Sequence, residues 1–422
     1  MWAHLKVNLT DILFSVSETM DLPDPSLVDH QVRTAYIASE LARAANLDHE
    51  LSERLFMAAM LHDIGALSPE EKIGVHVAED LFPGAHCLRG GKLFREAFWL
   101  APAGEIVDWH HTPISQHQKE GRSFADDNVL AAQFLLLADH LERWIDRRQF
   151  ILHQSDRLRT QVSQLSGDIL HPDVIQLLRQ VSTCEDFWLE LVSKDLALRL
   201  QQRCPLRSID LDFEAARAIA VVLKDITDFR SRFTASHSSG VAACARSLAQ
   251  RLAFSGKDLQ QIEIAGFLHD VGKLVVPNAI LCKPERLTAE EYAIIRQHPF
   301  YTYRVLSRVR GFEQIAEWAS YHHERLNGSG YPGRLERNAL DVGAKIVAVA
   351  DVASAIAESR PYRDQGNKET VISALRNMSA QKLLEPVIVE ALTDDYDEIV
   401  GASLEAQAED ERRYQERYMT IT

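Results

Sequence analysis

The stretch Phe267-Leu268-His269-Asp270-Val271-Gly272-Lys273 decides how this chain is interpreted. An imidazole stands beside a carboxylate, and a lysine follows three residues after the aspartate. Adjacent side chains on a helix project about 100° apart, so His269 and Asp270 are expected to reach one polar cavity from a buried helix. Such a pair suits a dinuclear metal site, in which the imidazole binds one ion and the carboxylate bridges two. The alternative is a buried hydrogen-bonded pair, which we favour for an isolated dipeptide.

The composition is ordinary for a soluble globular protein, with 46% hydrophobic and 25% charged residues in a chain of 422. This length allows two or three domains with full cores, and apolar residues recur at helical spacing nearly everywhere. We therefore predict an all-α fold. Charged residues interrupt the segment Met1–Met20, which argues against a signal peptide, and no apolar run reaches membrane-spanning length. A cytoplasmic protein without membrane insertion is expected.

The cysteines and the net charge limit the cell compartment, the kind of metal site and the kind of binding partner to be expected. The five cysteines lie far apart and form no CxxC pair, which fits a reducing cytoplasm and argues against a cysteine-based zinc site. The formal net charge is −15, whereas a broad nucleic-acid-binding surface needs clustered positive charge. We therefore expect no DNA or RNA polymer as a partner. A small phosphorylated substrate is compatible with this charge, because a metal pair and a few arginines can invert the local field.

Histidines and aspartates recur in the same order in both halves of the chain. A first histidine precedes the His-Asp pair by 32 residues in each half, from 237 to 269 and from 30 to 62. A middle histidine precedes a His-His pair by 24 residues, from 298 to 322 and from 86 to 110. A final aspartate follows by 29 residues, from 322 to 351 and from 110 to 139. Three matched intervals indicate a tandem duplication of one helical domain.

We place the domain boundary near residues 205–215, which gives two tandem helical-bundle domains over 1–210 and 211–422. The candidate metal ligands of the second domain are His237, His269, Asp270, His298, His322, His323 and Asp351. Their counterparts form a possible second metal site in the first domain, with His30, His62, Asp63, His86, His110, His111 and Asp139. Imidazole and carboxylate ligands without thiolates suit divalent ions of Fe, Mn, Zn, Ni or Co, and the sequence does not choose among these metals.

The second half contains more than metal-ligand residue types. The His-Asp segment is followed by His322-His323-Glu324-Arg325-Leu326-Asn327-Gly328-Ser329-Gly330-Tyr331-Pro332 and then by Arg360-Pro361-Tyr362-Arg363. Over about residues 215–400 the chain resembles the HD-GYP subfamily of the HD phosphohydrolase superfamily. HD-GYP proteins are bacterial phosphodiesterases of second-messenger signalling that open cyclic dinucleotides, chiefly cyclic di-GMP and in some members the hybrid cGAMP. The tandem organisation also resembles certain bacterial cGAMP phosphodiesterases, whose first domain supports the second.

The resemblance implies a role for each residue that matches the family pattern. One ion would be held by His237, His269, Asp270 and Asp351. Asp270 would bridge to a second ion, whose other ligands would be His298, His322 and His323. Catalysis would involve Asp270 together with Lys273 near the scissile phosphate. The substrate would contact Lys273, Gly330, Tyr331, Arg360 and Arg363.

One departure from the family pattern bears on the number of metals. Some members have a glutamate four residues before the first histidine, where it supports a third ion. Phe233 stands at that place here. We therefore expect a dinuclear site with two divalent transition-metal ions.

The first half keeps the ligand pattern but lacks the groups that position a substrate. Ala66 stands in the place of Lys273, and Gln118-Lys119-Glu120 falls opposite Gly330-Tyr331-Pro332. We favour a degenerate domain with a structural or regulatory role. A metal-loaded binding module and an enzyme for another substrate are the alternatives.

These patterns together predict a metal-dependent hydrolase that converts a cyclic dinucleotide, first of all cyclic di-GMP, into the linear dinucleotide. The closest alternative has the same chemistry and acts mainly on 3'3'-cGAMP. An alternative of another class is a weakly active or inactive cyclic-dinucleotide sensor that signals through a partner protein. The intact Lys273 and Gly330-Tyr331-Pro332 disfavour the sensor. A homodimer or an association with other signalling proteins is the expected assembly.

Overall fold

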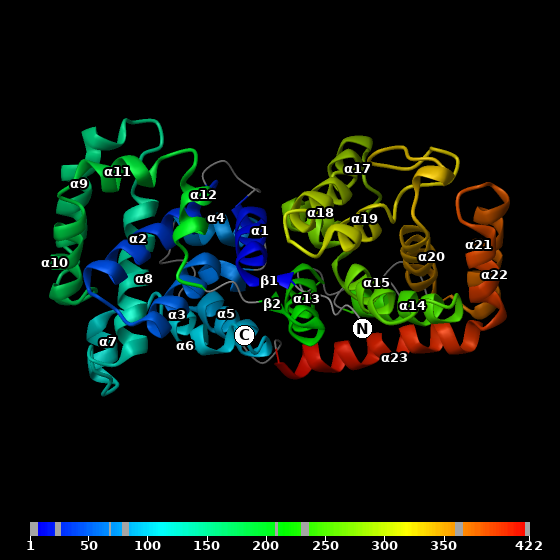
Figure 1. Cartoon of the computed structure of the whole chain (residues 1–422), viewed down its shortest axis with the longest axis horizontal. Coiled ribbons are helices and arrows are strands. Elements are labelled where there is room, and N and C mark those ends of the chain that lie inside the picture. The colour runs from blue at the N-terminus through cyan, green and yellow to red at the C-terminus, as the bar shows by residue number, and fades with distance from the viewer. Residues whose placement is uncertain are drawn as a thin grey trace. The chain divides into compact units, whose positions relative to one another are not determined.

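Helices dominate the chain (Figure 1). The computed structural model describes residues 7–21, 27–66, 69–77, 84–206, 210–228, 236–358 and 366–417. Across those ranges the strands are β1 (Val7–Asn8) and β2 (Asp210–Leu211), which pair antiparallel through Val7 with Leu211 and Asn8 with Asp210. The predicted all-α class is confirmed.

The chain forms two compact units, each with its own core. The N-terminal unit comprises residues 9–66 and 71–209. The C-terminal unit comprises the residues from 210 onward together with β1 and a short segment that ends at Glu70. Among the described helices, none combines the length and the apolar character needed to cross a membrane.

The N-terminal unit is a bundle in which α2 packs against α3 and α8. The centre of α8 is buried on all sides, as its consecutive residues Leu135, Leu136 and Leu137 show with at most 1% exposure. Its helices, including the 3-10 helices η1 and η3, are α1 (Leu9–Asp21), α2 (His30–Ala44), α3 (His49–Leu61), η1 (His62–Gly65), α4 (Pro69–Val77), α5 (Ala85–Glu96), η3 (Ala101–Ala103), α6 (Gly104–Asp108), α7 (Ile114–Lys119), α8 (Asp127–Arg143), α9 (Ile151–Ser163), α10 (Pro172–Val181), α11 (Glu185–Leu191) and α12 (Leu196–Arg203).

The C-terminal unit is built around α14, which packs against α15, α20 and the long α23 that runs along it (Figure 1). The carboxylate of Asp341 caps α20 by accepting hydrogen bonds from the Gly343 amide at 2.9 Å and from Trp318 Nε1 at 2.6 Å. Its helices are α13 (Phe213–Asp228), α14 (His237–Arg251), α15 (Lys257–Leu268), η4 (Val271–Val275), α16 (Asn278–Leu281), α17 (Ala289–Ile295), α18 (His298–Leu306), α19 (Glu313–Ser320), η5 (Arg337–Ala339), α20 (Val342–Ala357), α21 (Lys368–Ala380), α22 (Pro386–Asp394) and α23 (Tyr396–Arg417).

The two units repeat one order of elements. The helices α2 and α14 each begin with the first histidine of their half. The helices α3 and α15 each lead into a 3-10 turn at the His-Asp pair, and α5 and α18 carry the middle histidine near their first residue. The final aspartates lie within α8 and α20. The duplication predicted from spacing is therefore present in the fold.

Candidate metal centre

Seven candidate ligands of the C-terminal unit converge from separate elements. His237 opens α14, His298 opens α18, and Asp351 lies in the middle of α20. His322 and His323 follow α19, which ends at Ser320 and is capped by Tyr321, so both histidines lie past a helix end. His323 is half-buried, and the other six residues of this set are at most 8% exposed. Scattered helices thus fix the spacing of the ligand atoms through the packing of the bundle.

The carboxylate of Asp270 faces two groups of imidazoles. Its Oδ2 lies 3.2 Å from His269 Nε2, and its Oδ1 lies 3.3 Å from His298 Nε2 and 3.9 Å from His322 Nε2. Asp270 Oδ1 is buried and accepts no hydrogen bond within the described part of the chain. A carboxylate whose two oxygens face separate imidazole groups has the geometry of a bridging ligand.

The imidazoles present lone pairs to one another. His298 Nδ1 lies 2.8 Å from the Ile295 carbonyl and His322 Nδ1 lies 2.6 Å from the Ala319 carbonyl, which makes each Nδ1 a donor and leaves each Nε2 with a lone pair. The two Nε2 atoms are only 3.3 Å apart. Burial lowers the pKa of His298 to about 3, so this imidazole is neutral. Facing lone pairs repel unless a cation lies between them, so the donor set fits a metal ion.

The second group on the opposite side of Asp270 is made by His237, His269 and Asp351. His237 Nε2 lies 3.2 Å from Asp351 Oδ1, and His269 Nε2 lies 4.0 Å from the same oxygen. Burial alone would raise the pKa of Asp270, but the charges of His269 and Lys273 hold it well below its usual value. The site therefore offers ionised carboxylates, which are the form that binds metal.

The His-Asp pair lies at a helix end, and the expectation that both side chains project from one α-helix is wrong. The helix α15 ends at Leu268, His269 caps it, and Asp270 precedes the 3-10 helix η4. The cause is close backbone packing at Gly272, where an added Cβ would lie 2.0 Å from the His298 carbonyl oxygen and 2.6 Å from the Thr302 amide nitrogen. Only glycine allows this approach, and the tight turn brings His269 and His298 to the same cavity.

Gly272→Ala should therefore weaken both the fold and metal binding. Overpacking of this kind costs about 1–3 kcal/mol in free energy of unfolding, and it moves α18 away from Asp270. Chemical denaturation and metal content of the purified variant measure the two effects. Gly401→Ala is the matched control, because a Cβ at this position in α23 meets no atom within 4 Å. The control should be unchanged or more stable, since alanine favours helix. Equal stability of Gly272→Ala and wild type would contradict the packing argument.

The less buried edge of this centre is lined by four side chains, those of Lys273, Arg296, His323 and Tyr331. Lys273 is 20% exposed and pairs with Asp270, and the Tyr331 ring lies 4.8 Å from the His323 ring between centroids. The guanidinium of Arg296 lies 5.0 Å from the centre of the Tyr331 ring. This edge is where a substrate can approach the buried ligands. The predicted contacts Arg360 and Arg363, and Phe233 as well, lie outside the described residues.

The loop that contains Gly330 and Tyr331 is anchored by Glu324. Glu324 is 1% exposed, and its carboxylate accepts hydrogen bonds from the Gly333 amide at 2.6 Å and the Leu335 amide at 2.9 Å. An added Cβ on Gly330 would lie 2.5 Å from Glu324 Cα. The loop backbone therefore packs directly against the backbone of Glu324 at Gly330, where a larger residue would not fit. This arrangement places Tyr331 beside His323.

Glu324→Gln should loosen that loop, because a glutamine side chain has a single acceptor oxygen for two amide donors. We expect the free energy of unfolding to fall by about 1–3 kcal/mol and KM for the substrate to rise, with metal content retained. Steady-state kinetics and thermal unfolding test this. Glu317→Gln changes an exposed carboxylate of the neighbouring α19 and should behave as wild type. Loss of bound metal in Glu324→Gln would show that the residue supports the ligands instead.

The N-terminal unit brings its seven counterpart residues together in the same way. Asp63 Oδ2 lies 3.5 Å from His30 Nε2 and 3.4 Å from His62 Nε2. Its Oδ1 lies 3.8 Å from His86 Nε2 and 3.9 Å from His110 Nε2. The other two members of the set are Asp139, 3.4 Å from His30, and His111, whose ring lies 4.1 Å from that of His110. The cluster therefore has two sides divided by Asp63.

The surroundings of this N-terminal cluster differ from those of the C-terminal one. Ala66, in the place of Lys273, is fully buried. The helix α7 follows the His-His pair, where the C-terminal unit has the loop with Tyr331. Arg143 lies 3.2 Å from Asp139 Oδ2, whereas its counterpart four residues after Asp351 is Ala355. The N-terminal unit thus has the ligand types without the substrate-facing side chains.

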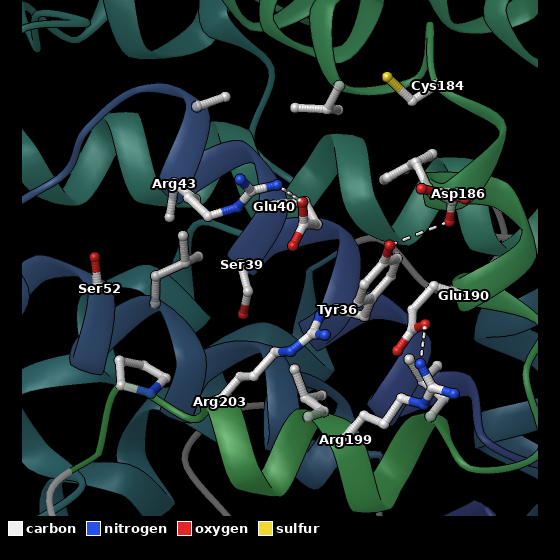
Figure 2. Close-up of a pocket in the computed structure, with 18 of the residues that line it drawn as sticks. Tyr36, Ser39, Glu40, Arg43, Ser52, Cys184, Asp186, Glu190, Arg199 and Arg203 are labelled. Atoms are coloured by element: carbon white, nitrogen blue, oxygen red, sulfur yellow. Dashed lines mark hydrogen bonds and ion pairs between the residues drawn. The ribbon is translucent and has the colours of Figure 1, made fainter.

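A large cavity of about 1360 Å³ lies elsewhere in the N-terminal unit, between α2, α3, α11 and α12 (Figure 2). None of the candidate metal ligands lines it. Figure 2 shows Arg43 beside Glu40 and Arg199 beside Glu190, and both are ion pairs. Asp186 and Arg203, which also line the cavity, have opposite charges as well, so the lining offers no concentrated charge to a phosphorylated ligand.

Sequence analysis missed supporting residues that belong to none of the motifs, although they lie near them in the chain. Glu358 Oε2 lies 3.3 Å from His237 Nδ1, and Thr302 Oγ1 donates a hydrogen bond to the His269 carbonyl at 3.0 Å. Arg296 precedes His298 by two residues, but no spacing rule connects it to Tyr331. Contacts of this kind arise from tertiary packing, so the sequence carried no signal for them.

Comparison with known families agrees with the geometry. The family model for the HD domain matches residues 27–144, and a second HD-domain model matches residues 221–386. The chain belongs to the HD-GYP group of the HD-domain family. The C-terminal match contains Gly330-Tyr331-Pro332, and we refer to the C-terminal unit as the HD-GYP domain; the N-terminal match has no such motif.

Several relatives of this HD-GYP protein have assigned activities. The 3'3'-cGAMP-specific phosphodiesterase 1 of Vibrio cholerae is 28% identical over 88% of this chain and 88% of its own length. The cyclic di-GMP phosphodiesterase response regulator RpfG of Xanthomonas campestris is 36% identical over 47% of this chain and 53% of its own length. A crystal structure of a cyclic GMP-AMP specific phosphodiesterase of V. cholerae covers 95% of this chain with a TM-score of 0.64 and 20% identity, which shows a common fold.

Proposed function

We propose that the HD-GYP domain hydrolyses a phosphodiester bond of a cyclic dinucleotide and releases the linear dinucleotide. The observation that carries the proposal is the position of Asp270, between two groups of imidazoles and beside Lys273. One ion would be held by His237, His269, Asp270 and Asp351. A second would be held by Asp270, His298, His322 and His323. Two divalent ions supply a water of lowered pKa and withdraw charge from the phosphate when they are bound.

The side chains at the exposed edge would bind and orient the substrate. Lys273 places a positive charge beside the ligands, where negative charge develops on the phosphate oxygens during hydrolysis. Tyr331 offers an aromatic face to a nucleobase, and Gly330 lets the loop pass close to its anchor. Arg360 and Arg363 are proposed to contact the phosphates. The burial of the ligands excludes bulk water from the reacting groups.

The identity of the cyclic dinucleotide is a finer part of the proposal. The relative that aligns over 88% of both chains is specific for 3'3'-cGAMP. The relatives named for cyclic di-GMP align mainly through one half of this chain. Cyclic di-GMP was the first expectation from sequence, but the tandem arrangement now favours 3'3'-cGAMP as the substrate to test beside it.

Hydrolysis of 3'3'-cGAMP and cyclic di-GMP, measured side by side with defined divalent metals, tests the function. We expect metal-dependent release of a linear dinucleotide, and chromatography also shows whether mononucleotides follow. Iron and manganese are the first metals to supply, followed by nickel, cobalt and zinc. A protein that carries two metal ions and binds either nucleotide without cleaving it would replace the enzyme by the sensor alternative.

The proposal includes a cytoplasmic location and assembly as a homodimer or with other signalling proteins. All five cysteines are free thiols, which suits a reducing compartment. Light scattering of the purified protein with and without nucleotide tests the assembly.

A further inference from the structure

One side of the N-terminal cluster encloses a thiol. Cys87 Sγ lies 3.5 Å from His86 Nε2 and 4.0 Å from His110 Nε2. The ligand atoms of these three residues and of His111 all lie within 4.8 Å of one another. A tetrahedral zinc ion with a Zn–S distance of about 2.3 Å and a Zn–N distance of about 2.05 Å separates sulfur from nitrogen by about 3.6 Å. The thiol and imidazoles therefore already stand near zinc-ligand spacing.

A second observation points to a cation at the same place. Asp63 Oδ1 faces this group, is buried, and accepts no hydrogen bond within the described residues. His110 Nδ1 lies 2.7 Å from the Val107 carbonyl, which makes Nδ1 the donor and turns the lone pair of Nε2 toward Cys87. Cys87 itself is 2% exposed. Buried lone pairs gathered beside a buried carboxylate favour a bound cation, whose charge the carboxylate would offset without being one of its ligands.

The thiol is specific to the N-terminal unit. Cys87 follows the middle histidine directly, and the residue that follows His298 in the HD-GYP domain is Pro299. Proline has no side-chain ligand, so the C-terminal group offers imidazoles and the carboxylate of Asp270 without a thiol. In the N-terminal unit the thiol of Cys87 adds a soft donor to the imidazoles. A tetrahedral zinc ion held by four protein ligands has no open position, and closed zinc sites of this kind are structural.

On the other side of the cluster, which contains His30 and Asp139, protein side chains balance the charges without a metal ion. The Arg143 guanidinium lies 3.2 Å from Asp139 Oδ2, and Glu142 Oε2 lies 2.6 Å from His30 Nδ1. Arg147 also pairs with Glu142 at 2.8 Å. These protein charges neutralise one another on that side. A single ion on the Cys87 side is therefore the loading that the surroundings favour.

We propose that the N-terminal unit binds one zinc ion through His86, Cys87, His110 and His111, as a closed structural site. The spacing rules for cysteine pairs overlook it, because one thiolate joins three imidazoles. The site would tie α5 to the turn after α6 without any role in hydrolysis. The proposal does not depend on the activity of the HD-GYP domain.

X-ray absorption at the zinc edge of the full-length, zinc-loaded protein gives the first test. We expect sulfur in the coordination shell of part of the zinc, because the HD-GYP domain has no thiol among its candidate ligands. Cobalt(II) substitution should likewise give a thiolate-to-cobalt charge-transfer band. A wild-type protein that shows neither signal overturns the proposal.

Two serine variants locate the sulfur. Cys87→Ser should lose the cobalt band and about one equivalent of zinc. Cys244→Ser, which changes a buried cysteine of α14 that belongs to no candidate metal group among the described residues, should keep both. A band that survives in Cys87→Ser assigns the sulfur to another cysteine and refutes the site. If Cys87→Ser does not fold, the wild-type sulfur signal and its loss on chelation decide the question.

Discussion

Asp270→Ala should abolish turnover, with kcat lower by roughly a thousandfold or more. Asp270 is the side chain whose two oxygens face both imidazole groups, so its removal takes a ligand from both proposed ions at once. It also removes the carboxylate that faces the Nε2 atoms of His269 and His298. Turnover assays with metal analysis of the purified variant measure the loss, and circular dichroism shows whether the helices remain.

The matched comparison is Asp63→Ala, which makes the same change at the equivalent place in the N-terminal unit. We expect it to lower kcat by less than about tenfold, because Ala66 and α7 replace the substrate-facing groups there. Substantial activity in Asp270→Ala would remove Asp270 as a bridging ligand. Equal losses in both variants would mean that the two units share the chemistry.

Lys273→Ala should lower kcat by about a hundredfold while both metals stay bound. The lysine pairs with Asp270 at the exposed edge, and it is the charge that distinguishes this centre from the N-terminal one. Removing one preorganised charge at a phosphoryl oxygen costs about that much. Single-turnover kinetics and metal content of the variant provide the measurement.

Lys283→Ala serves as the control, since Lys283 pairs with Glu291 outside the ligand set. Its kcat should stay within about twofold of wild type, because partly exposed ion pairs contribute little. The alternative result is that Lys273→Ala loses bound metal and that kcat falls only in proportion to the metal lost. Lys273 would then position Asp270 and would have no charge effect on the phosphate.

Ligand spacing carried most of the predictable information. A duplicated helical domain keeps the number of residues between its ligands. The sequence intervals from His237 to His269 and from His298 to His322 could therefore be compared with those of the first half without a structure. The all-α class followed from apolar periodicity in the same way. Lys273 and Tyr331 were recognisable because each belongs to a continuous sequence motif, His269–Lys273 for the lysine and His322–Pro332 for the tyrosine.

The rest depended on packing that no local pattern encodes. The 3-10 turn at Gly272 exists because the backbone of α18 approaches within the space of one methyl group. Glu358 and Thr302 support His237 and His269 from other helices. Cys87 has no cysteine partner in sequence, and its significance comes from the imidazoles that the fold brings around it.

The pairing of β1 with β2 has a consequence for synthesis of the chain. Val7 and Asn8 leave the ribosome roughly two hundred residues before Leu211 and Asp210, the residues with which they pair. The N-terminal unit is therefore complete before this small sheet of the C-terminal unit can close. A gene fragment that starts at residue 210 would encode β2 without its partner strand β1. Supplying that strand as a separate peptide, or fusing it ahead of residue 210, follows directly from the topology.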